Sequence, residues 1–94
     1  MKNAGPITVH VPGPLRSYAR ASELGVAAHS VRALLDELER RHPELHHNIC
    51  NETGALRQHI NLFINTNHMR DCNGLDTPLV DGDVVTILPA VSGG

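Results

Sequence analysis

The sequence predicts an α+β fold in which one main helix packs across a small mixed sheet of four to five strands. Three observations lead to this prediction. Apolar residues alternate with polar ones near both ends of the chain, a helical stripe of apolar residues lies between them, and 94 residues allow only one small domain. We expect this domain to cover residues 1–88 and a flexible C-terminal arm to follow at 89–94.

The first element is a strand over residues 7–11, because apolar Ile7, Val9 and Val11 alternate with polar residues. The Pro-Gly-Pro segment that follows ends this strand. A second strand is expected within residues 17–27, where it would return beside the first strand as a hairpin.

The main helix is predicted to begin after Ser30, a suitable N-cap, and to end before Pro43, which biases the preceding residue away from helical geometry. Between them, apolar residues recur at the spacing i, i+3, i+4 and i+7, which is one stripe of a helix: Val31, Leu34, Leu35 and Leu38. Residues 43–49 add either a turn or a short second helix. The buried stripe requires a sheet on which the helix can lie.

Two further strands are expected in the second half of the chain. Residues 51–58 are predicted to be a surface loop and residues 59–65 a strand. The apolar residues of this strand would face inward: Ile60, Leu62 and Ile64. A turn-rich segment with room for a very short strand leads to the turn dipeptide Asp81-Gly82, and residues 84–88 form the last strand. In this order of elements, the first and last strands can lie side by side as a parallel central pair.

The open face of the sheet is predicted to carry an apolar patch. Thr86 is the polar member of the last strand, and if it faces solvent, Val84 and Leu88 lie on the same face. Phe63 points to this face from its own strand. Three large apolar groups on so small a domain suggest a protein-binding patch. The alternative is a set of separately exposed apolar side chains, which are common on protein surfaces.

Charge and composition argue against nucleic-acid and membrane partners. The net charge is −2, and the chain has almost no aromatic side chains on which bases could stack. The N-terminus lacks an apolar secretory region, so we expect a cytoplasmic protein. Four acids and no bases follow Arg70, which suggests either a basic docking surface on a partner or ordinary turn carboxylates: Asp71, Asp76, Asp81 and Asp83.

Motifs of independent catalysis do not occur in the sequence. It contains neither a phosphate-binding loop nor a nucleophile elbow. Of seven histidines, only His42, His46 and His47 cluster, and Pro43 interrupts the face that they could share, so surface histidines are favoured over a metal site. The two cysteines belong to no metal-binding pattern and are expected to be free thiols. We therefore expect a chain that is not an enzyme, binds no cofactor and holds no metal.

The C-terminus is the best remaining candidate for chemistry. A terminal carboxylate is ionised at neutral pH and becomes reactive when a partner joins it to AMP. Glycine has no Cβ, so Gly93 and Gly94 would fit a narrow channel in that partner. We expect Gly94 to be the modified residue, with Val91, Ser92 and Gly93 as the channel arm.

Residues 78–94, PLVDGDVVTILPAVSGG, resemble the C-terminal signature of the ubiquitin-like sulfur carriers, the MoaD/ThiS family. The resemblance implies the β-grasp fold and a carrier whose Gly94 is adenylated by an ATP-dependent, ubiquitin-activating-like adenylyltransferase. It further implies that a sulfur donor then forms a C-terminal thiocarboxylate, which a downstream synthase uses as its sulfide source. In relatives, the residue before the proline packs in the partner interface. Leu88 holds this position, and Val84, Phe63 and Pro89 are expected in the same interface.

The middle of the chain, LRQHINLFIN, is more similar to the carriers that feed cysteine synthesis. The resemblance there implies a pyridoxal-phosphate synthase that acts on an activated serine, and a JAMM-type metalloprotease, as partners. Molybdopterin synthase small subunits often carry Phe where this chain has Leu88, so that pathway is an alternative, as are thiazole, transfer RNA thiolation and natural products. Two other classes stay open: a protein modifier joined through Gly94 to lysines, and a plain interaction domain.

Overall fold

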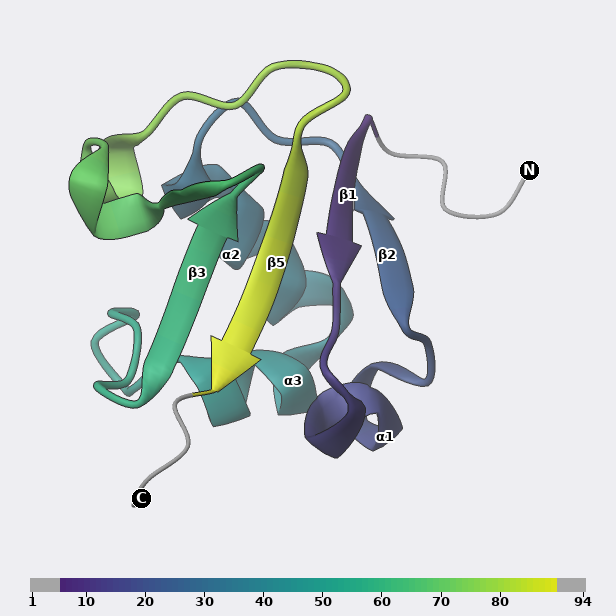
Figure 1. Ribbon diagram of the computed structural model, residues 1–94. Helices are drawn as coiled ribbons and strands as arrows, with labels where there is room; N and C mark the ends of the chain where they lie inside the picture. Colours follow the sequence, from purple (N-terminus) through teal and green to yellow (C-terminus); the bar gives the residue numbers. More distant parts are fainter. Residues whose placement is uncertain (1–5, 90–94) are drawn as a thin grey trace.

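Five strands form one mixed sheet in the order β2-β1-β5-β3-β4 in the computed structural model, which describes residues 6–89 (Figure 1). The central strands β1 (Ile7–His10) and β5 (Val84–Pro89) run parallel. Antiparallel neighbours flank them: β2 (Glu23–Val26) beside β1, and β3 (Ile60–Ile64) beside β5. The short strand β4 (Asn67–His68) pairs with the end of β3. The predicted parallel central pair and mixed sheet are confirmed.

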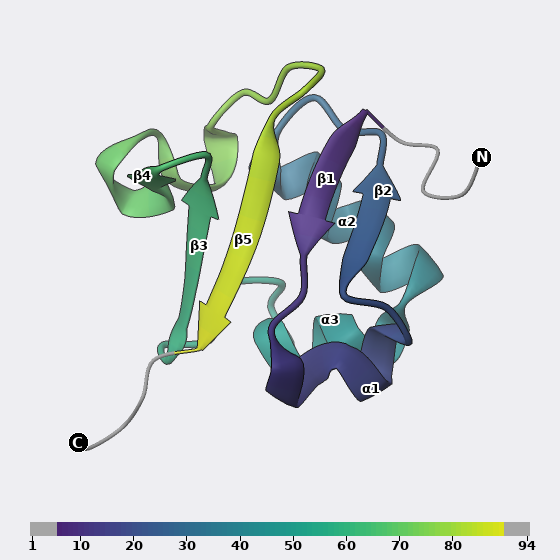
Figure 2. The ribbon, with the colours of Figure 1, turned by 45° about the vertical axis from the view of Figure 1, so that its right-hand side comes forward.

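Two helices cover one face of this sheet (Figure 1, Figure 2). Helix α2 (Val31–Arg41) begins where the sequence predicts, because the Ala33 N–H donates to Ser30 Oγ at 3.1 Å. Its predicted apolar stripe is buried against the sheet. Helix α3 (Pro43–Ile49) follows directly, so a short second helix is the outcome for this segment.

The connection from β1 to β2 was not predicted. It contains a 3-10 turn, η1 (Gly13–Leu15), and a single helical turn, α1 (Arg16–Ala19). Four helical residues are too few to show a hydrophobic period, which explains why the sequence pattern did not indicate them. The strand β2 lies within the predicted range 17–27 but occupies only its end.

The core lies between the helices and the inward face of the sheet. Along each long strand every second side chain is buried, as the alternation predicts: Ile7 and Val9, Ile60, Leu62 and Ile64, Val85 and Ile87. The strand β5 runs one residue further than predicted, because Pro89 pairs with Ile60 instead of beginning the arm. A proline is tolerated there because it needs no partner for an N–H group.

Loops and 3-10 turns complete the described chain. The predicted surface loop follows α3 and is closed by a bridge between Cys50 and Leu56. After β4, the chain forms η2 (Met69–Asp71) and η3 (Gly74–Asp76). The predicted turn before β5 is confirmed, and Gly82 adopts φ 95° in it, a conformation that glycine accepts without strain. Within residues 6–89, no helix has the length and apolar character needed to cross a bilayer.

Candidate partner-docking face

The open face of the sheet brings together three of the four residues predicted to contact a partner. Val85 and Ile87 are buried under the helices, so Val84, Thr86 and Leu88 face the opposite side. Leu88 is 45% exposed, and Val84 is half-buried. The predicted assignment of the two faces of β5 is confirmed.

Cross-strand register places Phe63 between the two apolar residues of β5. Phe63 lies opposite Thr86 and therefore diagonal to Val84 and Leu88, at the ~7–8 Å typical of such neighbours. Its ring is half-buried. The three apolar side chains thus form one open-face patch, defined here as Val84, Leu88 and Phe63. Pro89, the fourth predicted residue, ends the same strand opposite the buried Ile60, so it falls on the side of Ile87 and not on the open face.

A polar frame on β3 and β4, which the sequence did not indicate, holds Phe63 in place. The His68 ring meets the Phe63 ring edge to face, with centroids 5.0 Å apart. His68 Nε2 lies 2.9 Å from Asn61 Oδ1, and its Nδ1 accepts the Arg70 N–H at 3.0 Å. An accepting Nδ1 assigns the ring proton to Nε2, so the neutral ring satisfies both contacts. The sequence did not indicate these contacts, because β4 has only two residues and shows no alternating pattern.

On the other side of Thr86, a histidine and a glutamate lie next to each other on the neighbouring strands β1 and β2. His10 lies beside Thr86 in the parallel register and opposite Glu23 in the antiparallel one. His10 Nδ1 and Glu23 Oε2 are 3.4 Å apart, and both side chains are about half exposed. The patch is therefore bordered by titratable polar groups on this side, which is typical of a protein-docking surface with a polar rim.

The acidic segment after Arg70 does not behave as one free docking surface. Asp76 Oδ1 accepts from Arg32 Nη2 at 3.0 Å. Asp83 accepts from the Val80 N–H at 3.0 Å and from Asn65 Nδ2 at 3.1 Å. For these two carboxylates the structure supports the alternative interpretation, ordinary turn carboxylates, because their oxygens already accept hydrogen bonds within the domain.

The predicted channel arm, Val91, Ser92 and Gly93, and the predicted modified residue, Gly94, lie outside the described residues. The structure does place the point from which they follow. β5 ends at Pro89, at the same end of the sheet as α1 and α3 (Figure 1, Figure 2).

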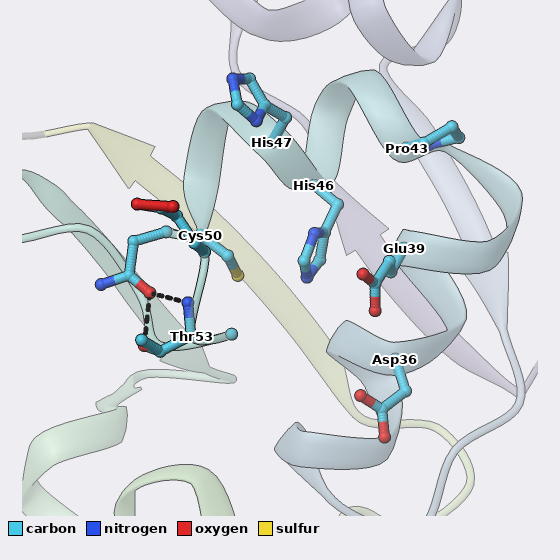
Figure 3. Close-up of a pocket in the computed structure, with 10 residues that line it drawn as sticks. Asp36, Glu39, Pro43, His46, His47, Cys50 and Thr53 are labelled. Atoms are coloured by element: carbon cyan, nitrogen blue, oxygen red, sulfur yellow. Dashed lines mark hydrogen bonds between the residues drawn. The ribbon is translucent and has the colours of Figure 1, made fainter.

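A separate hollow of about 450 Å³ lies between α2, α3 and the loop after Cys50 (Figure 3). His46 turns into it near Glu39, whereas His47 turns away (Figure 3). No group of three or more His, Cys, Asp or Glu side chains within residues 6–89 has an arrangement that could hold a metal ion. Of the three clustered histidines, His42 and His46 are half-buried and His47 is exposed.

Cys50 lines this hollow but is only 1% exposed, and burial raises the pKa of its thiol to about 11. The nearby Arg57 opposes this rise in pKa, and Glu39 adds to it. Cys72, in contrast, is exposed. Only a thiolate attacks an alkylating reagent, so the two cysteines should differ in reactivity.

We expect iodoacetamide at pH 8 to modify Cys72 in the folded chain and Cys50 only after unfolding, as read by intact mass. Because the folded pKa of Cys50 lies above the ordinary 9.0, the protonated thiol stabilises the fold below about pH 9. This stability should be lost as the pH rises from about 9 towards 11. Cys50→Ala should remove this alkaline slope, whereas Cys72→Ala should keep it. Rapid labelling of Cys50 in the folded Cys72→Ala chain would contradict its burial.

Comparisons with known proteins agree with this geometry. The model of the ThiS family matches residues 9–94. The chain is 31% identical over 91 residues to the sulfur carrier protein CysO of Mycobacterium tuberculosis, covering 94% of this chain and 98% of the relative. The likeness therefore extends over nearly the whole length of both chains.

Two solved structures match the fold over almost the whole chain. A chain in the crystal structure of the Amycolatopsis orientalis BexX/CysO complex has a TM-score of 0.84 and 32% identity, covering 94% of this chain and 99% of its own length. The solution structure of small archaeal modifier protein 1 from Methanosarcina acetivorans has a TM-score of 0.83 and 34% identity, with 94% and 95% covered. With its β-grasp sheet and this match, the chain belongs to the ThiS family of ubiquitin-like sulfur carriers.

Proposed function

We propose that this sulfur carrier holds sulfur as a thiocarboxylate on Gly94 and delivers it to a biosynthetic enzyme. The observation that carries the proposal is the alignment with CysO, a sulfur carrier protein, over 94% of this chain. The chain acts in this scheme as a protein substrate and carrier, and its partners perform the catalysis. ATP is used by the activating partner, and the carrier binds no cofactor.

The proposed chemistry proceeds in two balanced steps. In the first, an oxygen of the Gly94 carboxylate attacks the α-phosphorus of ATP in the activating enzyme, which forms an acyl-adenylate and releases pyrophosphate. In the second, hydrosulfide supplied by a donor attacks the acyl carbon, AMP leaves with the bonding electron pair, and loss of the thiol proton leaves the thiocarboxylate. Adenylation is needed because the ionised carboxylate is a poor electrophile.

Docking through the domain offsets the entropy lost when the arm is ordered in an active site. Fixing each backbone residue costs about 1–2 kcal/mol, so a five-residue arm needs binding energy from elsewhere. The open-face patch supplies apolar area beside the point where β5 ends, with Leu88 its most exposed member. We propose that Leu88, Val84, Phe63 and Pro89 form the interface with the activating enzyme and with the downstream synthase.

Cysteine synthesis is the pathway that we favour for the sulfur. The likeness to CysO supports it, and the structure of a BexX/CysO complex shows that a related carrier assembles with another protein. In this proposal the thiocarboxylate sulfur displaces the leaving group of an activated serine in a synthase, so the Gly94 carbonyl stays joined to the new cysteine. A JAMM-type metalloprotease then hydrolyses that bond, which releases cysteine and returns the Gly94 carboxylate. Molybdopterin, thiazole, transfer RNA and natural-product pathways are the alternatives.

Intact mass tests the proposal directly. The full chain should be co-expressed with the activating enzyme and sulfur donor of the same genome, purified and weighed. Replacement of one terminal oxygen by sulfur is the expected result, and treatment with an alkylating reagent should then add one further group at the C-terminus. As a positive control, the same enzymes should convert a sulfur carrier that they are known to accept to its thiocarboxylate. If they do so and the mass of this chain stays unchanged, the proposal is overturned.

A protein modifier is the second candidate function. It is favoured by the likeness to small archaeal modifier protein 1, at 34% identity. Conjugation would join Gly94 to lysines of target proteins and would appear in the same experiment as added protein mass. Lys2 is the only lysine of this chain, so linkage between copies has a single acceptor side chain.

A further inference from the structure

A second hollow lies at the end of the domain where β5 stops. It has a volume of about 450 Å³ and forms between the turn that ends α1 and the junction of α2 with α3. Tyr18 and Arg20 line one side, and Arg41, His42 and Glu44 line the other. None of these residues belongs to the open-face patch.

Positive charge dominates this hollow. Its lining includes two guanidinium groups and one carboxylate. Burial, and then the charge of Arg41, lower the pKa of His42, so this ring adds no charge near neutral pH. Arg41 is pinned in place because its Nη1 donates to the Gly25 carbonyl at 3.2 Å. The remaining N–H groups of the Arg41 guanidinium can donate to a ligand.

Arg20 is presented to the hollow by an unusual backbone. It ends α1 in the left-handed region, at φ 59°, and its N–H donates to the Arg16 carbonyl at 2.6 Å. A residue with a Cβ is strained there by about 1–2 kcal/mol, and glycine is the ordinary choice. Within residues 6–89, the Arg20 side chain makes no ion pair or hydrogen bond. Its guanidinium is therefore free for a partner.

The hollow lies on the side of the domain from which the C-terminal arm follows. The parallel register pairs Thr8 with Val84 and His10 with Thr86, so β1 runs in the direction of β5 and leads into η1 towards the end where β5 stops. Both ribbon views place α1 at the end of the sheet where β5 stops (Figure 1, Figure 2). Asp81 and Asp83 come directly before β5 and therefore lie at its opposite end. An enzyme that binds the C-terminal arm would therefore approach the end of the domain where this hollow lies.

We propose that this hollow binds an acidic segment of the activating enzyme, with Arg20 and Arg41 contacting its carboxylates. The inference rests on the proposed adenylation of Gly94. Arginine pairs with carboxylates through two parallel hydrogen bonds, and Tyr18, which is 39% exposed, adds an aromatic surface beside them. Glu44 at the rim disfavours a polyanion such as nucleic acid, which carries charge continuously along its length.

The test measures binding of the full chain to the activating enzyme of the same genome by calorimetry at low and at high salt. Arg20→Glu should weaken binding at least about tenfold at low salt, and its affinity should depend less on salt than that of the wild type. Arg20→Gly removes the charge and the strain together, so it should lose part of the affinity while its thermal stability stays equal or rises.

Arg32→Glu is the matched control, since it makes the same charge change at an exposed arginine near the start of α2, away from both the hollow and the open-face patch. It should change the affinity less than about twofold. Equal affinities of the Arg20→Glu and Arg32→Glu chains would overturn the inference. The inference would also fail if Arg20→Glu abolished binding of a single-stranded oligonucleotide but left binding of the enzyme unchanged.

The two proposals fail in different ways. A wild-type chain that shows no ATP–pyrophosphate exchange with the enzyme defeats the proposed function, and this inference with it. A wild-type chain that is adenylated, together with an Arg20→Glu chain that binds equally well, defeats only the inference about the hollow.

Discussion

Ile87→Ala is expected to lower the free energy of unfolding by about 2–5 kcal/mol, and Leu88→Ala by less than about 1 kcal/mol. The two residues are neighbours on β5, but Ile87 is 1% exposed and Leu88 is 45% exposed. Successive side chains of a strand point to opposite faces, so only Ile87 leaves a cavity when it is shortened. Urea unfolding of both variants measures the difference.

Leu88→Glu extends the same comparison to function. Its unfolding midpoint should stay near that of the wild type, because the carboxylate remains in water on the open face. Binding to the activating enzyme should weaken at least about tenfold, since the charge would be buried against an apolar contact. A large loss of stability in Leu88→Glu, or an Ile87→Ala chain as stable as the wild type, would show that the two faces of β5 are assigned in reverse.

Addition of one alanine after Gly94 should lower the rate of adenylation at least about 100-fold. The added residue moves the carboxylate by about 3.3–3.6 Å along the chain, and a misplacement of about 1 Å can already cost such a factor. It also brings a Cβ to the position where glycine fits a narrow channel. ATP–pyrophosphate exchange with the activating enzyme measures the effect.

The matched control for this extension is one alanine added before Met1, which changes the length equally at the other end of the chain. Both variants should unfold at the wild-type midpoint, since neither change touches the core. Exchange at the wild-type rate by the C-terminally extended chain would mean that the Gly94 carboxylate is not the reacting group.

Much of the fold follows from patterns within single segments. Ser30 and Pro43 bound α2 because a cap and a proline act on their immediate neighbours. The strands β3 and β5 were found because each buries one face only, which leaves a period of two. The turn α1 was not predicted, because a single helical turn shows no hydrophobic period. The strand β4 was expected only as a very short strand.

The polar frame and the basic hollow could not be predicted for a different reason. His68, Asn61 and Phe63 meet only because β3 turns back on β4. Arg20 and Arg41 come from segments about twenty positions apart, and the packing of α1 against α3 brings them to one hollow. Sequence spacing carries no information on such contacts, because they depend on how whole elements pack.

The sequence by itself determined the fold class, the extent of α2, the inward and outward faces of the strands, and the Gly-Gly ending that resembles a sulfur carrier. These features are local, since caps, turns and hydrophobic periods act between residues a few positions apart. Only the tertiary structure decided that Phe63 lies between Val84 and Leu88, and that Asp76 and Asp83 accept hydrogen bonds within the domain. It also decided that Arg20 and Arg41 line one hollow at the end where β5 stops. Pairing register and helix packing join distant segments, and in doing so they decide which side chains a partner meets together.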